Sequence, residues 1–289
     1  MSVPTSLPNS DSFLVRHEFL IRRLHSLSGL VPIGAYMCVH LLTNASLLVG
    51  AGRFQANVNM IHNLGPALPL VEWLFIFLPL IFHAVVGVWI ASTGHTNTHQ
   101  YPFTANRRYS WQRLTGYLAF VFIFTHVFHL HGWFHTEWWL KTVAEPLGMA
   151  QFRPYNAAST LATALTGVAW PIFYAAGLLA CCYHLANGVW TAGITWGVWL
   201  TPDAQRRATA ACAVFGILLS IVGLSSLWAV KTTDIDQAKN IEQAMINARI
   251  ESGEINDDPH KRSGVVPDSH SVSEVGQNIA PTEKSAIVE

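Results

Sequence analysis

The sequence predicts an all-α integral membrane protein with five transmembrane helices. Only 12% of the 289 residues are charged and 51% are hydrophobic, whereas soluble domains carry about 25% charged residues. Apart from Glu72, the charges lie outside five apolar runs, and each run reaches the ~20 residues that cross a bilayer as a helix. A soluble core can bury one such run but not five, so the chain is expected in membrane lipid.

The five apolar runs are the expected spans. Four of them contain no Asp, Glu, Lys or Arg, and the second contains only Glu72, near its start. Tryptophans cluster near the ends of the runs, as they do in the aromatic belts of membrane proteins. In order along the chain, the expected spans are residues 27–49, 69–92, 114–133, 165–190 and 208–230.

The segments outside the spans differ in character. Residues 1–26 are polar and lack the apolar stretch of a cleavable signal peptide, so we expect a cytoplasmic N-terminal segment before the membrane domain of residues 27–231. Residues 232–250 carry Ile, Ala and Met at helical spacing, which predicts a weakly amphipathic extension of the last helix. Residues 251–289 are polar and contain no aromatic side chain, which predicts a disordered tail.

The distribution of Lys and Arg predicts the orientation in the membrane. The N-terminal segment and the second and fourth loops carry eight of these residues, against three in the first and third loops. Because cytoplasmic loops are enriched in Lys and Arg, the N-terminus is expected in the cytoplasm and the C-terminus outside. The net charge of zero gives no indication of a nucleic-acid partner.

Each of the first four expected spans has one histidine in its interior. Ionisable side chains inside a membrane are costly, so each of them indicates a function by default. With the expected orientation, two of the histidines lie in the outer half of the bilayer and two in the inner half. The outer pair is His40 and His126, and the inner pair is His83 and His184.

Two facing neutral imidazoles are the ligands of a bis-histidine haem iron, and helix bundles house such cofactors in their cores. Gly87 and Gly188 each follow an inner histidine by four residues, which leaves a gap one turn away on the same helix face. Gly29 and Gly116 precede the outer histidines by eleven and ten residues, which places them at the depth of the inner pair. The pattern predicts that the first four helices form a bundle holding two b-type haems.

The same side chains are also compatible with less specific roles. A lone histidine in an apolar span is commonly a hydrogen-bonded packing residue, and glycine in membrane helices commonly permits close packing. A zinc site at His126, His129, His131 and His135 would lack a carboxylate or cysteine within the span, and the chain has no C-x-x-C motif. A haem-free transporter relaying protons would need more acidic or unwound helix positions than Glu72 and Pro79 provide.

The histidine-bearing segments carry a resemblance to a known family. The segments RRLHSLSGLVPIGAYMCVHLLTN, FLPLIFHAVVGVWIA, WQRLTG and YHLANGVWTAGITWG resemble the dihaem cytochrome b membrane subunits of succinate dehydrogenases and fumarate reductases. The match is to the single-subunit, five-helix kind that works with menaquinone, and it covers about residues 16–230. It implies a bacterial cytoplasmic-membrane anchor that passes electrons from a flavoprotein and an iron–sulfur subunit through two haem b groups to the quinone.

The resemblance also implies roles for residues. In that family, the second and fourth helices hold the haem proximal to the iron–sulfur subunit, here His83 and His184, and the first and third hold the distal haem, here His40 and His126. Candidates for binding haem propionates or the iron–sulfur subunit are Arg22, Arg23, His25, Ser26 and Arg113. Their arginines are explained equally well by the orientation of the chain.

Candidates for the quinone site or its proton route are His62 and Glu72. Some fumarate-reducing relatives carry a Glu two residues before the histidine of the fourth helix, where this chain has Cys182. This departure favours succinate oxidation over fumarate reduction. An anchor for quinol:fumarate reductase, or for another dehydrogenase or a hydrogenase, stays an alternative, and homo-oligomerisation of the complex is left open.

Overall fold

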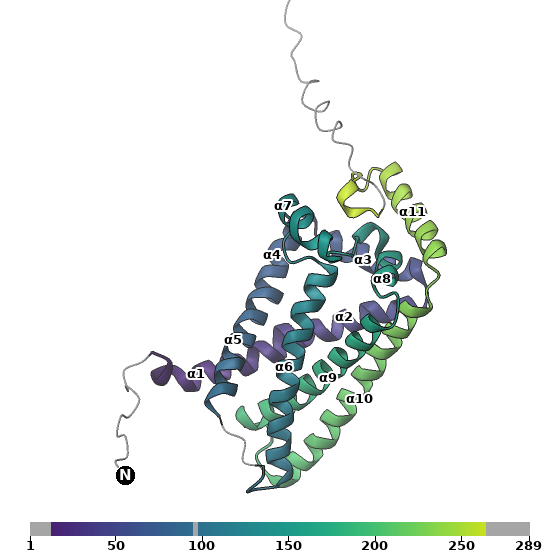
Figure 1. Cartoon of the computed structure of the whole chain (residues 1–289). Coiled ribbons are helices and arrows are strands. Elements are labelled where there is room, and N and C mark those ends of the chain that lie inside the picture. Colours follow the sequence, from purple (N-terminus) through teal and green to yellow (C-terminus); the bar gives the residue numbers. More distant parts are fainter. Residues whose placement is uncertain (1–12, 95–97, 264–289) are drawn as a thin grey trace, which may run out of the picture.

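The computed structural model describes residues 13–94 and 98–263, and nearly all of this part of the chain is helical (Figure 1). Five of its helical segments are long and apolar enough to cross a membrane, which confirms the predicted all-α membrane fold. The segments are Arg16–Leu48, Gly65–Thr93, Thr104–Leu130, Ala169–Thr195 and Pro202–Thr232.

The first span is one continuous helical rod made of three parts. These are α1 (Phe13–Ser28), the π-helical turn η1 (Gly29–Gly34) and α2 (Ala35–Ala45), followed by the 3₁₀ turn η2 (Ser46–Leu48). Pro32 lies inside η1 and has no N–H to donate, so the regular helical hydrogen bonding is interrupted there. The helix begins well before residue 27, because polar side chains can continue a helix beyond the apolar layer.

The second and third spans follow after a short 3₁₀ turn, η3 (Gly65–Ala67). The second consists of α4 (Leu68–Glu72), the π-helical turn η4 (Trp73–Phe77) and α5 (Leu78–Thr93). The third is the unbroken helix α6 (Thr104–Leu130). A π-helical turn therefore interrupts both of the first two spans, and such turns occur frequently at functional sites.

The fourth and fifth spans, α9 (Ala169–Thr195) and α10 (Pro202–Thr232), complete the bundle. Helix α9 packs against both α6 and α10, while α2 packs on α10 and α1 packs on α5. Helices α5 and α6 touch each other only sparsely, so the bundle is loosely closed on that side. Large apolar side chains such as Phe75, Val85 and Ile217 are exposed on the outside of the spans, as a lipid-facing surface requires.

Short helices gather at one end of the bundle, here called the cap end (Figure 1). Most of them lie outside the apolar runs and were not predicted from the sequence. The elements are α3 (Ala51–His62), α7 (Glu137–Trp139), η5 (Leu140–Ala144), η6 (Glu145–Leu147), η7 (Pro154–Asn156), α8 (Ala157–Ala164), α11 (Ile235–Glu251) and η8 (Pro259–Lys261). We call the opposite end, where α5 and α9 terminate, the open end.

Two buried side chains join the cap together. The carboxylate of Glu242 on α11 accepts hydrogen bonds from the backbone N–H groups of Ala158 and Ser159, at 2.5 and 3.2 Å, and from the Ser159 hydroxyl. Gln55 on α3 accepts from the N–H of Ala157 at 3.0 Å. These are the free donors at the start of α8, and an anion there is stabilised by the helix dipole.

The C-terminal region differs from expectation in two ways. Helix α11 is a separate helix rather than a continuation of α10, because the chain turns at Thr233 and Asp234 caps the new helix. Residues 252–263, expected to belong to a disordered tail, pack on the cap instead. There Tyr155 donates to the carbonyl of Asn256 at 3.2 Å, and the N–H of Ser263 donates to Asn156 at 2.9 Å. The rest of the tail, residues 264–289, and residues 1–12 of the N-terminal segment lie outside the described residues.

Candidate functional site

The structure brings the four histidines together as two facing pairs. His83 of α5 and His184 of α9 have ring centroids 6.1 Å apart and ring planes 86° apart. His40 of α2 and His126 of α6 have ring centroids 5.9 Å apart and ring planes 80° apart. Because a metal–imidazole bond is about 2 Å long, two imidazoles facing one metal ion have centroids about 6 Å apart. Each pair has the spacing that a single iron atom between the rings requires.

The pairs lie at two depths. Gly29 lies so close to His83 that a methyl group at this glycine would overlap the imidazole ring, and a methyl group at Gly116 would come within 2.9 Å of His184. Both glycines are therefore level with the His83–His184 pair, as their spacing in the sequence predicts. They precede the other two histidines by ten or eleven residues, which separates the pairs by about 15 Å along the helices.

The other two glycines make room for side chains. A methyl group at Gly87 would lie 3.1 Å from the ring of His25, and one at Gly188 would lie 3.6 Å from the Gln112 amide nitrogen. The space expected for a macrocycle at Gly87 and Gly188 is thus taken by His25 and Gln112. Sequence spacing finds a gap on a helix face but does not identify which neighbour fills it.

Backbone carbonyls fix the tautomers of the pair near the open end. The Nδ1–H of His83 donates to the carbonyl of His25, and that of His184 donates to the carbonyl of Gln112, each at 3.0 Å. A carbonyl oxygen can only accept, so Nδ1 carries the proton in both rings and the lone pair of Nε2 is free to bind a metal ion. In the other pair, Nδ1 of His126 is buried without a hydrogen-bond partner.

A cavity of about 870 Å³ opens between the helices beside the His83–His184 pair. Most of its lining surface is apolar, and its volume is in the range of cofactor sites. Towards the cap end it reaches the aromatic side chains of Trp73, Phe77 and Trp133. The buried Nδ1 of His25, which also lines the cavity, has no hydrogen-bond partner. The mainly apolar cavity, the buried Nδ1 atom without a partner and the two free Nε2 atoms fit a bound haem.

The residues expected to bind propionates divide into two groups. Arg22, His25 and Ser26 line the cavity, and Arg22 is paired with Glu18 at 2.7 Å. Arg23 and Arg113 do not line it. Arg23 donates to the carbonyl of Thr195 at the end of α9, at 3.2 Å. Arg113 donates to the carbonyls of Gly94 and Ile90 at the end of α5, at 2.9 and 3.3 Å. Both therefore satisfy carbonyls at helix C-termini, where a cation is favourable.

The two quinone candidates are not brought together. His62 ends α3 in the cap, where its Nδ1 donates to the carbonyl of Val58 at 3.0 Å. Burial lowers the pKa of His62; the hydrogen bond to Val58 opposes this shift, and the charge of Lys261 adds to it. Glu72 ends α4 and directly precedes Trp73, which lines the cavity, but the Glu72 side chain itself does not line it.

The histidines considered for zinc have other contacts. His129 is buried, shares a hydrogen bond of 2.9 Å with the Tyr174 hydroxyl and stacks on Trp170 with centroids 3.7 Å apart. His135 contacts the carbonyl of His131 at 3.1 Å. Within residues 13–94 and 98–263, no three His, Cys, Asp or Glu side chains lie together as they would around a metal ion. His129 is thus a packing residue.

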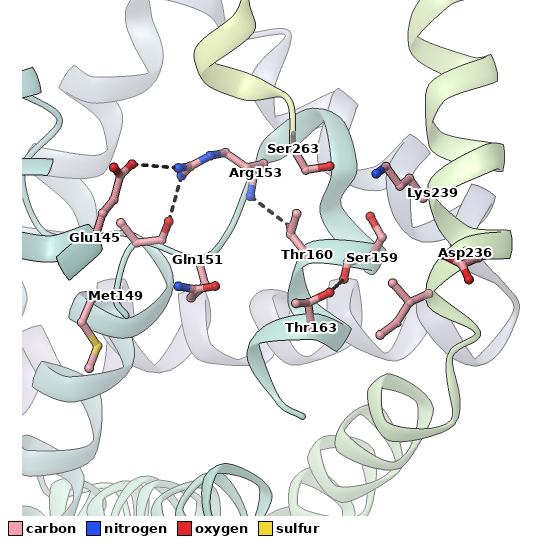
Figure 2. A pocket seen from close by; sticks show the side chains of 12 residues that line it. Glu145, Met149, Gln151, Arg153, Ser159, Thr160, Thr163, Asp236, Lys239 and Ser263 are labelled. Atoms are coloured by element: carbon pink, nitrogen blue, oxygen red, sulfur yellow. Dashed lines mark hydrogen bonds and ion pairs between the residues drawn. The ribbon is translucent and has the colours of Figure 1, made fainter. Parts of the chain in front are cut away.

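A second cavity, of about 390 Å³, lies in the cap and is lined mainly by polar side chains (Figure 2). Arg153 spans one wall, where it pairs with Glu145 at 3.3 Å and donates through its backbone N–H to Thr160 at 3.1 Å. None of the four span histidines lines this cavity. It is a polar surface hollow, separate from the cavity beside the histidine pairs.

Two polar residues that support the site were not predicted from the sequence. Gln112 and Asn187 lie beside His184, and they share a hydrogen bond of 2.7 Å between the two side chains. Gln112 belongs to the segment WQRLTG and Asn187 to YHLANGVWTAGITWG, so both lie in or at the edge of an apolar run. A polar side chain in or next to an apolar run is the signal that identified the four histidines, and the same signal could have identified these two amides.

Five apolar spans with two facing histidine pairs inside the bundle place the chain in the class of multi-pass helical membrane proteins with paired intramembrane histidines. No family model matches the sequence. The chain is 35% identical over 213 residues to the succinate dehydrogenase cytochrome b558 subunit of Bacillus subtilis (strain 168), and the match covers 73% of this chain and 96% of that relative. The chain therefore belongs to the family of succinate dehydrogenase cytochrome b subunits.

Proposed function

We propose that this chain is the membrane anchor and electron-transfer subunit of a succinate:quinone oxidoreductase. In this role it carries electrons from an iron–sulfur subunit, through two b haems, to menaquinone. The observation that supports this most directly is the pair of facing imidazoles at each of two depths, with centroids 6.1 and 5.9 Å apart. The Bacillus subtilis relative is named as a succinate dehydrogenase cytochrome subunit, so flavoprotein and iron–sulfur subunits are the proposed partners.

The four span histidines of this chain would hold the redox centres. His83 and His184 would hold the proximal haem, and His40 and His126 the distal haem, through their Nε2 atoms. A haem iron with two imidazole ligands supplies one-electron transfer and has no open position for a substrate. Succinate chemistry therefore takes place on a partner subunit, and this chain is the quinone-reactive part of the enzyme.

The open end is the proposed face for the partner subunits. Arg22, His25 and Ser26 line the cavity there and would bind propionates. Arg23 and Arg113 would add positive potential while they cap α9 and α5. This end lies on the cytoplasmic side of the bacterial membrane in our proposal, because the expected orientation places the N-terminus inside.

Menaquinone is proposed to react near the cap end of the bundle. Glu72 would serve the proton route there, and His62 is the second candidate, within the cap. Cys182 is fully buried against Leu41 and Leu219, which leaves no carboxylate at the position where some fumarate-reducing relatives carry Glu. We therefore propose succinate oxidation as the direction, and assays with succinate and fumarate distinguish it from the alternatives.

Single histidine substitutions in the purified complex test the proposed haem pairs. Replacing His83 or His184 by Ala should remove one b haem from the reduced-minus-oxidised spectrum and leave the other, and replacing His40 or His126 should remove the other haem. His135→Ala is the control, since His135 is exposed beyond the end of α6. An assembled complex that keeps two haems after loss of any of the four histidines would contradict the proposal.

A further inference from the structure

Residues 112 and 184 exchange hydrogen bonds in both directions. The His184 ring donates to the carbonyl of Gln112 at 3.0 Å, and the Gln112 side chain donates to the carbonyl of His184 at 3.1 Å. The bonds join α6 to α9 at the level of the proximal pair. The backbone of Gln112 therefore holds the His184 ring, and the side chain of Gln112 is bonded to the backbone of His184.

Two further residues extend this contact towards the open end. The Oε1 of Gln112 accepts from Asn187 at 2.7 Å, and the Oδ1 of Asn187 accepts from the guanidinium of Arg108 at 3.0 Å. Arg108 also stacks over Trp190, 3.7 Å from the ring centroid, and donates to Thr209 on α10 at 3.1 Å. Asn187 is only 4% exposed, so it must be satisfied by these partners.

Among the described residues, the other three span histidines have no network of several side chains that links their support to further helices. His83 donates to the carbonyl of His25, which also accepts from the Ser28 hydroxyl at 2.9 Å, but this local support ends at Ser28 and does not extend through further side chains. Nδ1 of His126 has no partner, and His40 contacts the Asn44 amide only through Nε2 at 3.4 Å. Among the four span histidines, only His184 is therefore supported by a network that extends over several side chains.

We propose that Arg108, Asn187 and Gln112 form a clasp that sets the orientation of the His184 ring and the potential of the haem it binds. The inference rests on the proposed function, because it takes His184 as a haem ligand. An Nδ1–H that donates to a well-placed carbonyl raises the electron density on Nε2, which favours ferric iron. Gln112 acts through His184 and is a positioning residue.

The test compares Gln112→Leu with the wild-type complex. This substitution keeps the carbonyl that accepts from His184 but removes the side-chain bonds to α9. We expect two haems to be retained, the midpoint potential of the proximal haem to rise, and its low-spin electron paramagnetic resonance signal to shift, because that signal reports the angle between the axial rings. The signal of the distal haem should stay unchanged.

Asn187→Ala provides a second, milder variant. It breaks the link between Gln112 and Arg108 but leaves the Gln112 bond to the His184 carbonyl, so we expect a smaller shift in the same direction. If Gln112→Leu fails to assemble, Asn187→Ala decides alone. Gln237→Leu is the matched control, since the same change is made at an exposed position of α11.

The outcomes separate the clasp from the proposed function. Two haems with an unchanged proximal signal and potential in both variants would overturn the clasp while leaving the haem assignment intact. Retention of both haems after His184→Ala would overturn the haem assignment instead. A shift in the distal rather than the proximal signal would also overturn the clasp.

Discussion

At the scale of single residues, the site depends on what surrounds each imidazole. Nδ1 of His83 and of His184 donates to a backbone carbonyl, so the ring orientation is set before any ligand arrives. The His25 ring stacks on His83 with centroids 4.0 Å apart, and its buried Nδ1 has no hydrogen-bond partner. These contacts hold the pair near the open end in a geometry suited to one iron atom.

Gly29 offers a test at this scale. Gly29→Ala would place a methyl group against the His83 ring, and overpacking of this kind costs about 1–3 kcal/mol. We expect the ring to be displaced and the proximal haem to be lost or its spectrum altered. Absorbance spectra of the purified complex measure this.

The control for Gly29→Ala is Gly188→Ala. Its methyl group would meet only the Gln112 amide, at an ordinary contact distance of 3.6 Å, so both haems should be retained. Equal haem loss in the two variants would contradict the claim that Gly29 is there to accommodate His83.

The pairing of the four histidines could be predicted from the sequence, because a polar ring stands out in an apolar run and its depth in the membrane follows from its position in that run. The roles of Gly87 and Gly188 could not be predicted, because the side chain that fills a gap belongs to another helix. The same holds for Arg23 and Arg113, whose partners are carbonyls at the ends of α9 and α5. Only tertiary structure reveals such partners.

At the scale of elements, the apolar runs in the sequence predict the spans, but no comparable pattern predicts the helices of the cap. A bilayer requires about 20 apolar residues from each helix, so every span has a strong signal. Helices α3 and α8 have 12 and 8 residues, and their stability comes from contacts with α11 rather than from their own sequence. The helical conformation of the residues just before position 27 could not be predicted either, because a polar segment carries no apolar periodicity that would indicate a helix.

Glu242 offers a test at the scale of elements. Burial raises the pKa of its carboxyl group, although the hydrogen bonds from Ser159 and Ala158 oppose that shift. The folded cap therefore binds a proton more tightly than the unfolded segment does. Docking of α11 should be strongest below the unfolded pKa and should weaken as the pH rises through the folded pKa.

Two substitutions separate the charge from the hydrogen bonds of Glu242. Glu242→Gln keeps an acceptor for α8 without a charge, so the pH dependence should disappear. Glu242→Ala leaves buried N–H groups unsatisfied and should cost about 1–3 kcal/mol. Hydrogen exchange of α8 and α11, followed from acidic to neutral pH, would measure both effects, and identical pH profiles in wild type and Glu242→Gln would contradict the assignment.

At the scale of the whole molecule, the two ends of the bundle differ. The cap end is closed by a core of buried apolar side chains that includes Phe54, Leu161 and Tyr174. The open end has no such cover among the described residues and displays arginines, which suits an end that faces other subunits. Helix α10 lacks a histidine but packs on both α9 and α2, so it supports one helix from each histidine pair.

The proposed function requires two b haems in this chain, one for each histidine pair. The most direct measurement is the amount of haem b per chain in the purified, assembled complex, determined from its pyridine haemochrome spectrum. The arrangement of His83 with His184 and of His40 with His126 predicts two haems per chain. A value of one or none in well-assembled wild-type complex would contradict it.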